Sequence, residues 1–209
     1  MKRKLITIAR QFCSGGDDIA QKLAEALNID FFDKGKIKER IKEHGIDEES
    51  FERLDKRTAS SFLYSLAVTS MHGHIPASIN DVVIGDHFFE TQSELINKIA
   101  SETDAIFLGR CADYILDSKY ELVKIFIYAD FEDRVEAAEK EFNIKDTHAR
   151  TLVKKSDKKR ASYYNFYTGK VWGNADNYDI SINAGTLGID STVKLLKTFI
   201  EIAISKHKQ

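Results

Sequence analysis

The sequence has a single proline, Pro76, and only two cysteines, Cys13 and Cys111, among its 209 residues. Two cysteines are too few for a disulfide framework, which favours a reducing, cytoplasmic location. The scarcity of proline and a total of eleven glycines argue against a long flexible linker and favour one domain over residues 1–209. No apolar run approaches the roughly 20 residues of a membrane span, and the run after the N-terminal basic residues is too short for a signal peptide.

An excess of one charge is also lacking, because 31 lysines and arginines face 33 aspartates and glutamates, for a net charge of −2. Without a basic excess to neutralise many phosphates, nucleic acid is not an expected bulk partner. Hydrophobic residues make up 43% of the chain and aromatic residues 11%, which is enough for a packed core. Four histidines lack a convincing metal-ligand spacing with carboxylates or cysteines, so we expect them to be structural: His72, His74, His87 and His148.

Short apolar runs alternate with helix-periodic stretches, which predicts an α/β fold with a five-stranded parallel sheet flanked by helices. Ligands of such doubly wound sheets bind beyond the carboxyl ends of the strands. Residues 68–90 contain Pro76 and two glycines and favour a loop or a mobile region. Strands are expected at 4–9, 30–32, 105–108, 122–128 and 178–182, and helices at 17–28, 34–67, about 90–102, 131–142 and 189–205.

The turn after the first expected strand has the layout of a phosphate-binding loop. Ser14, Gly15 and Gly16 would bare backbone N–H groups to a phosphate at the start of the following helix. The usual pattern G-x-x-x-x-G-K-[ST] is not met, because Arg10 stands at the first glycine and Gly16 at the lysine. An ordinary turn sharpened by glycines is the alternative. Arg10, Lys34 or a lysine from the basic segment described below would have to supply the missing cation.

Two aspartates, Asp17 and Asp18, follow this turn. They complement the dipole of the helix but would repel a phosphate directly. Carboxylates at this position would more readily hold Mg²⁺, directly or through water, and Asp17 is our first candidate ligand. Simple capping of the helix is the alternative for both residues.

Candidate phosphate-binding residues also follow the second and third expected strands. Gly109 and Arg110 come directly after one of them, and the planar fork of an arginine there suits a phosphate in the binding crevice. A surface ion pair of Arg110 with Asp113 is the alternative. Asp33 and Lys34 would contact an acceptor substrate, unless Asp33 only caps the next helix.

Residues 146–170 are strongly basic and end in a dense group of aromatic residues. Cations on a segment that closes over the site would clamp a transferring phosphoryl group and exclude water. A solvated helix face is the ordinary explanation of such a run. An RNA-binding strip is a further alternative, although the overall charge disfavours it.

Several ordered segments resemble the cytidylate-kinase-like family, P-loop relatives of the nucleoside monophosphate kinases. Together they span nearly the whole chain except about 40–90. Cys13 departs from the family pattern, which usually has a glycine there, and Asp17-Asp18 departs from a basic-acidic pair. The matching segments are 8–16, 31–34, 107–116, 156–164 and 167–179.

The resemblance implies a P-loop kinase fold with an acceptor-binding insertion at 35–90 and a lid at 143–175. It implies that the glycine turn cradles the donor phosphates and that Arg110 holds the phosphate of the acceptor nucleotide. Asp157 and Arg160 would form the lid pair, with Arg160 stabilising the transferring group. The site residues implied are Ser14, Gly15, Gly16, Gly109, Arg110, Asp113, Asp157 and Arg160.

The activity implied is transfer of a phosphoryl group from ATP to a nucleoside monophosphate, with CMP as the first candidate acceptor and Mg²⁺ as the metal. Nucleotides are then the expected partners, with neither nucleic acid nor membrane. The missing lysine favours a regulatory pseudokinase with little catalysis as an alternative. A kinase for another small acceptor is the third hypothesis, because residues 40–90 match no known acceptor site. The apolar positions of 34–67 would serve a homodimer as well as a core.

Overall fold

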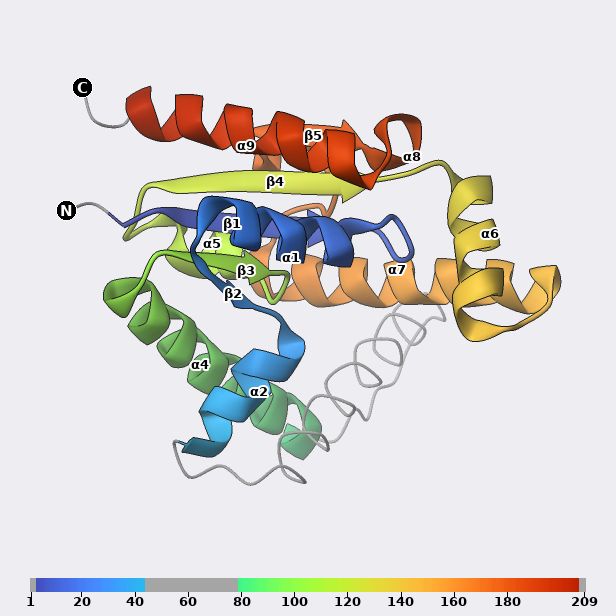
Figure 1. Cartoon of the computed structure of the whole chain (residues 1–209). Helices are drawn as coiled ribbons and strands as arrows, with labels where there is room; N and C mark the ends of the chain where they lie inside the picture. The colour runs from blue at the N-terminus through green and yellow to red at the C-terminus, as the bar shows by residue number, and fades with distance from the viewer. Residues whose placement is uncertain (1–2, 44–78, 207–209) are drawn as a thin grey trace.

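Within the described part of this computed structural model, residues 3–43 and 79–206, five parallel strands form one sheet (Figure 1). Their order is β2-β3-β1-β4-β5, so β1 lies at the centre and pairs with β3 and β4. The strands are short apolar runs because a parallel sheet is covered on both faces. The predicted parallel sheet is confirmed. Its strands are β1 (Leu5–Arg10), β2 (Asp30–Phe32), β3 (Ala105–Leu108), β4 (Leu122–Tyr128) and β5 (Ile180–Asn183).

Helices cover both faces of the sheet (Figure 1). Strand β1 shows the division, because Leu5 joins one core cluster while Ile6 and Ile8 join the other. Helices α1 and α9 pack on the Ile6 face, and α4, α5 and the end of α7 pack on the Leu5 face. The helices are α1 (Gly16–Leu27), α2 (Lys34–Glu43), α4 (Ile79–Glu102), α5 (Ala112–Asp117), α6 (Phe131–Phe142), α7 (Asp146–Thr168), η1 (Ala175–Asn177), α8 (Ala184–Leu187) and α9 (Ile189–Lys206).

Helix α4 corrects the expectation of a loop over residues 68–90. It begins at Ile79 and continues to Glu102, so the loop is wrong over residues 79–90. Glycine and β-branched residues in that stretch weaken the local helix propensity. The later turns of α4 bury Ile96 in the core next to the sheet, however, and tertiary packing outweighs the local preference.

The insertion expected over residues 35–90 is described only in part. Helix α2 confirms the start of the helix expected over 34–67, and residues 44–78 lie outside the described residues. None of the helices that the structure describes is both long and apolar enough to cross a lipid bilayer.

Helices α6 and α7 form a lobe that projects from the end of the sheet (Figure 1). A small cluster of Val135, Ala138, Ala149 and Val153 holds the two helices together. Phe12, from the turn between β1 and α1, packs against the same cluster. The lobe therefore lies directly beside the turn that the sequence predicts to bind phosphate.

The C-terminal half of α7 is anchored to α5 by a buried hydrogen bond. The Tyr164 hydroxyl donates to Asp113 Oδ2 at 2.7 Å, and both residues are buried. Burial raises the pKa of the Asp113 carboxyl, although the bond from Tyr164 opposes the rise. Asp113 thus meets the core side of α7 rather than an open surface.

We expect Tyr164→Phe to lower the free energy of unfolding by about 1–3 kcal/mol at pH 7, because a buried carboxyl loses its donor. The folded-state pKa of Asp113 already lies above the unfolded value of about 4. Ionisation of the Asp113 carboxyl therefore weakens the fold as the pH rises through its folded-state pKa. Loss of the Tyr164 hydroxyl raises this folded-state pKa further, because the hydrogen bond lowers it. The variant should be less destabilised at pH 4 than at pH 7 in urea denaturation.

Tyr120→Phe is the matched control, since its hydroxyl makes only a 3.4 Å contact with the Asn97 carbonyl oxygen. We expect it to stay within about 0.5 kcal/mol of the wild type. Equal, pH-independent losses in the two variants would contradict the proposed anchor.

Candidate functional site

The turn between β1 and α1 exposes the N-terminus of α1 without a side-chain cap. Gly15 takes a left-handed conformation with φ of 75°, which favours glycine. The Ser14 hydroxyl donates to the Gln11 carbonyl at 2.9 Å and braces the turn from inside. Gly15 has no side chain with which to cap the first N–H groups of α1, and a helix N-terminus of this kind is suited to binding an anion.

Arg10, the last residue of β1, extends across the start of α1. Its guanidinium donates from Nη2 to Asp17 Oδ1 at 2.7 Å and from Nε to Asp17 Oδ2 at 3.1 Å. Only 17% of the Arg10 side chain is exposed, against 64% for Asp17. Partial removal from water raises the pKa of Asp17, but the hydrogen bond and charge of Arg10 outweigh this and hold it below its usual value.

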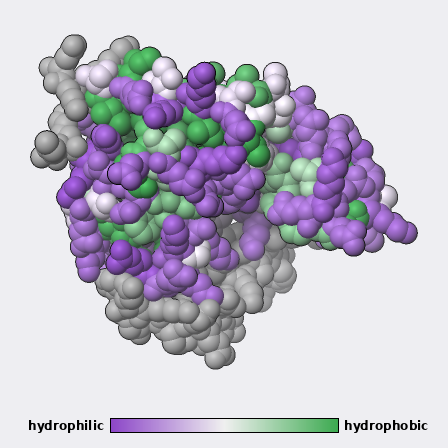
Figure 2. All heavy atoms as spheres, viewed as in Figure 1, coloured by the Kyte–Doolittle hydropathy of each residue, from purple (hydrophilic) through white to green (hydrophobic). Residues whose placement is uncertain are grey.

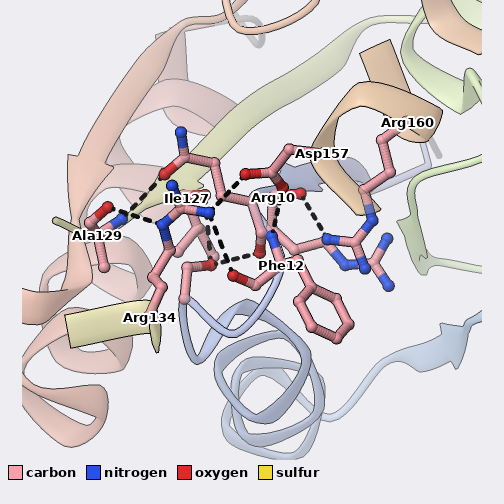
Figure 3. A network of polar contacts seen from close by, with 9 residues as sticks. Arg10, Phe12, Ile127, Ala129, Arg134, Asp157 and Arg160 are labelled. Carbon is pink, nitrogen blue, oxygen red and sulfur yellow. Dashed lines mark hydrogen bonds and ion pairs between the residues drawn. The ribbon is translucent and has the colours of Figure 1, made fainter. Parts of the chain in front are cut away.

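The carboxylate of Asp157 joins α7 to the turn (Figure 3). Its Oδ1 accepts the backbone N–H of Phe12 at 2.8 Å, and its Oδ2 accepts Nη1 of Arg134 at 2.5 Å. Arg134 on α6 is buried and also donates from Nε to the Ala129 carbonyl at 3.0 Å. Asp157 thus uses both oxygens to hold the turn and the lobe together.

Arg160 lies one turn beyond Asp157 on α7 and faces the same turn (Figure 3). Its Nη1 donates to the backbone carbonyl of Arg10 at 3.1 Å, and its guanidinium lies 5.5 Å from the centroid of the Phe12 ring. Burial, together with the positive charge of Arg10, lowers the pKa of Arg160 to about 10. The group remains charged at neutral pH, so an anion between the two arginines would relieve their repulsion.

A cavity of about 320 Å³ opens where the turn, α7 and the ends of β2 and β3 meet. In Figure 2, hydrophilic residues cover much of the neighbouring lobe and the adjoining body. Five of the residues around the cavity are cationic and none of the described lining residues is acidic. The lining is Arg10, Phe12, Lys34, Leu108, Arg110, Ser156, Lys159, Arg160 and Tyr163.

The structure brings four of the predicted site residues to this cavity: Arg10, Lys34, Arg110 and Arg160. Arg110 follows the end of β3, and its guanidinium lies 5.9 Å from the centroid of the Phe88 ring. Its backbone carbonyl accepts a hydrogen bond from Nε2 of the buried Gln92 at 3.1 Å. Ser14, Gly15 and Gly16 form the adjoining turn. These residues come from three separate strand ends and one helix, as expected for a parallel sheet.

Other predicted residues lie outside the lining of the cavity. Asp33 accepts the Lys36 backbone N–H at 2.9 Å and so caps α2. Asp113 is held by Tyr164, and Asp18 is exposed on the first turn of α1. Gly109 follows β3 with φ of 74°.

Arg134 was missed by sequence reasoning, although a signal exists. It lies among the apolar positions of α6, four residues before the buried Ala138. A charged residue in the inward stripe of an amphipathic helix indicates a buried partner. Its partner, Asp157, is distant in sequence, so the pattern alone does not identify the pair.

Metal and thiol chemistry have few candidates here. No group of three His, Cys, Asp or Glu side chains able to hold a metal occurs within residues 3–43 and 79–206. Asp17 fits a Mg²⁺ ion only if its carboxylate releases Arg10. Burial and the nearby Glu141 raise the pKa of Cys13 to about 12, and burial raises that of Cys111, so both thiols stay protonated at neutral pH.

Solved structures with similar folds include a crystal structure of an uncharacterized protein from Eubacterium ventriosum. It shares 27% identity with a TM-score of 0.70, and the match covers 96% of this chain and 99% of that one. A shikimate kinase from Bacteroides thetaiotaomicron has 14% identity and a TM-score of 0.55, with 95% and 98% covered, and shows the fold alone. No protein of curated function matches the sequence significantly.

The sequence also matches the family profile described as the cytidylate kinase-like family. The match runs over residues 5–186 and includes the turn, the end of β3 and α7. The resemblance of the separate motifs is therefore confirmed over most of the chain, and the protein belongs to the cytidylate kinase-like family.

Proposed function

We propose that the protein transfers the γ-phosphoryl group of ATP to the phosphate of a nucleoside monophosphate, with CMP as the first acceptor to test. The observation that carries the proposal is the cavity where Arg10, Lys34, Arg110, Lys159 and Arg160 converge. Two phosphorylated substrates bring several negative charges to one point, and positioned cations stabilise the group in transfer. Membership of a kinase-like family supports the same chemistry.

The donor would bind at the turn before α1. The N–H groups of Ser14, Gly15 and Gly16 would hold its phosphates at the uncapped helix N-terminus. Arg160 would stabilise the transferring group from α7, since its guanidinium reaches the backbone of Arg10 at 3.1 Å. Asp157 would keep α7 in register with the turn through the Phe12 N–H.

The acceptor phosphate would bind nearer to the ends of β2 and β3. Lys34 and Arg110 line the cavity from that side. Asp33 and Asp113 would act indirectly, the first by capping α2 next to Lys34 and the second by anchoring α7. Mg²⁺ would neutralise charge on the donor phosphates, and Asp17 on the first turn of α1 would hold it with a carboxylate oxygen released from Arg10.

Nucleotide binding without transfer is the second candidate function. Gly16 occupies the position where the usual phosphate loop has its lysine, and this favours a regulatory protein. The two functions share a binding site and differ in whether product is formed.

Ligand binding and turnover separate these candidates. ATP at 100 times its Kd should add about 2.7 kcal/mol to the free energy of unfolding, which raises Tm by several degrees. CMP should add a further shift, and Mg²⁺-ATP with CMP should yield ADP and CDP. A Tm shift without ADP formation would favour the regulatory function. ADP formation with another acceptor, and not with CMP, would identify that acceptor as the substrate. No shift with any nucleotide at millimolar concentration would contradict both candidates.

We expect Arg160→Ala to reduce kcat by about 10³-fold or more, because a positioned arginine contributes that much to phosphoryl transfer. The measurement is steady-state turnover with ADP formation as readout, with Tm checked alongside. Lys22→Ala is the control, because it removes the same charge from a residue outside the cavity lining. Lys22 on α1 pairs with the exposed Asp190 of α9. Wild-type turnover in Arg160→Ala would show that Arg160 does not stabilise the transferring group.

Arg110→Ala should act mainly on the acceptor. We expect KM for the acceptor to rise roughly tenfold or more, because a charge-assisted bond to its phosphate is lost. KM for ATP should change little. Equal losses for both substrates would contradict an acceptor-side position for Arg110.

A further inference from the structure

The side chain of Arg10 passes directly over Gly16. A Cβ atom on Gly16 would lie 2.6 Å from Arg10 Cβ and 2.7 Å from Arg10 Cγ. Non-bonded carbon atoms prefer about 3.5–4.0 Å. No residue with a side chain fits at Gly16 while Arg10 keeps this position, so the side chain of Arg10 at the end of β1 requires a glycine at the lysine position.

A second glycine leaves room for the other end of the same side chain. A Cβ atom on Gly109, just after β3, would lie 2.9 Å from Arg10 Nη1. Gly16 and Gly109 come from separate segments, yet both border the course of one arginine. The side chain runs from β1, across the start of α1, to the cavity that it lines. Gly16 is the stricter of the two constraints, because a Cβ there would meet the Cβ and Cγ of Arg10 rather than the movable end of its side chain.

The pair with Asp17 sets the direction of the guanidinium. Asp17 stands where the usual loop has a hydroxyl residue, and both of its oxygens accept bonds from Arg10, at 2.7 and 3.1 Å. This fork-to-carboxylate geometry has a defined orientation, unlike a contact with a point charge. It holds the charge of Arg10 at the first turn of α1.

We propose that Arg10 replaces the missing lysine of the phosphate loop. The positive charge that a usual loop supplies from the first residue of the helix comes here from the last residue of the preceding strand, across Gly16. Arg10 binds the donor phosphates in this arrangement, and Asp17 is a positioning residue that acts through it. This inference rests on the proposed function, because it assumes that a nucleotide binds at the turn.

The test is the affinity for Mg²⁺-ATP, measured by calorimetry on the full chain. Arg10→Met keeps a stem over Gly16 but removes the charge, and we expect its affinity to fall roughly 10- to 100-fold. Gly16→Lys alone should also bind weakly, because the new side chain overlaps the stem of Arg10. Arg10→Gly combined with Gly16→Lys rebuilds the usual pattern, and we expect its affinity to return to within about threefold of the wild type.

Lys22→Met is the matched control, since it removes one charge from an exposed pair and should leave the affinity unchanged. Tm without ligand reports whether each variant is folded. Wild-type affinity in Arg10→Met, or a folded double variant that binds no better than Arg10→Gly, would overturn the inference. Failure of the wild type itself to bind Mg²⁺-ATP would instead contradict the proposed function.

Asp17→Asn tests the positioning role. The probe is ATP without Mg²⁺, so that the role proposed for Asp17 as a metal ligand does not enter the measurement. We expect Asp17→Asn to weaken ATP binding in the wild-type background and to have no further effect in Arg10→Met, because the positioning acts through Arg10. A structural role would give the same loss in both backgrounds, and that result would refute the positioning role.

Discussion

The carboxylate of Asp157 is the contact on which the geometry of the site depends, because it joins two parts of the chain that share no strand. One oxygen holds the backbone of the turn at Phe12 and the other holds the buried Arg134 of α6. Arg160 projects from the next turn of the same helix. The distance between Arg160 and the start of α1 is therefore set by a hydrogen bond to the main chain, which is independent of side-chain rotamers on the turn.

Electrostatic repulsion is the second constraint on this site. A chain with a net charge of −2 places five cationic side chains around one cavity without an acidic residue among its described lining residues. Burial and the charge of Arg10 already lower the pKa of Arg160, which means that the charged form is less favourable there than in water. Core packing and the anchor between Tyr164 and Asp113 hold α7 in place despite this repulsion. A polyphosphate is a natural counter-charge for such an arrangement.

Sequence patterns predicted the elements that packing and local preference both support. The strands at 105–108 and 122–128 have the predicted bounds, because a parallel strand buried on both faces is a continuous apolar run. The loop expected over 79–90 is wrong, since packing of the later turns of α4 outweighs a weak local preference. Among the site residues, Lys34 and Arg110 could be predicted from their place after a strand, whereas Arg134 pairs with a residue far along the chain.

The sequence alone determined the alternation of strands and helices, the glycine turn, the absence of its lysine and the list of candidate cations. These properties are local, because they depend on periodicity and on residues within a few positions of each other. Only the tertiary structure decided that Arg10 crosses Gly16, that Gly109 leaves room for it and that Asp157 uses both oxygens to hold the turn. The physical reason is that side-chain direction at the end of a strand depends on the neighbouring strands and helices. Those neighbours are brought together by the fold of the whole chain, and no short segment specifies them.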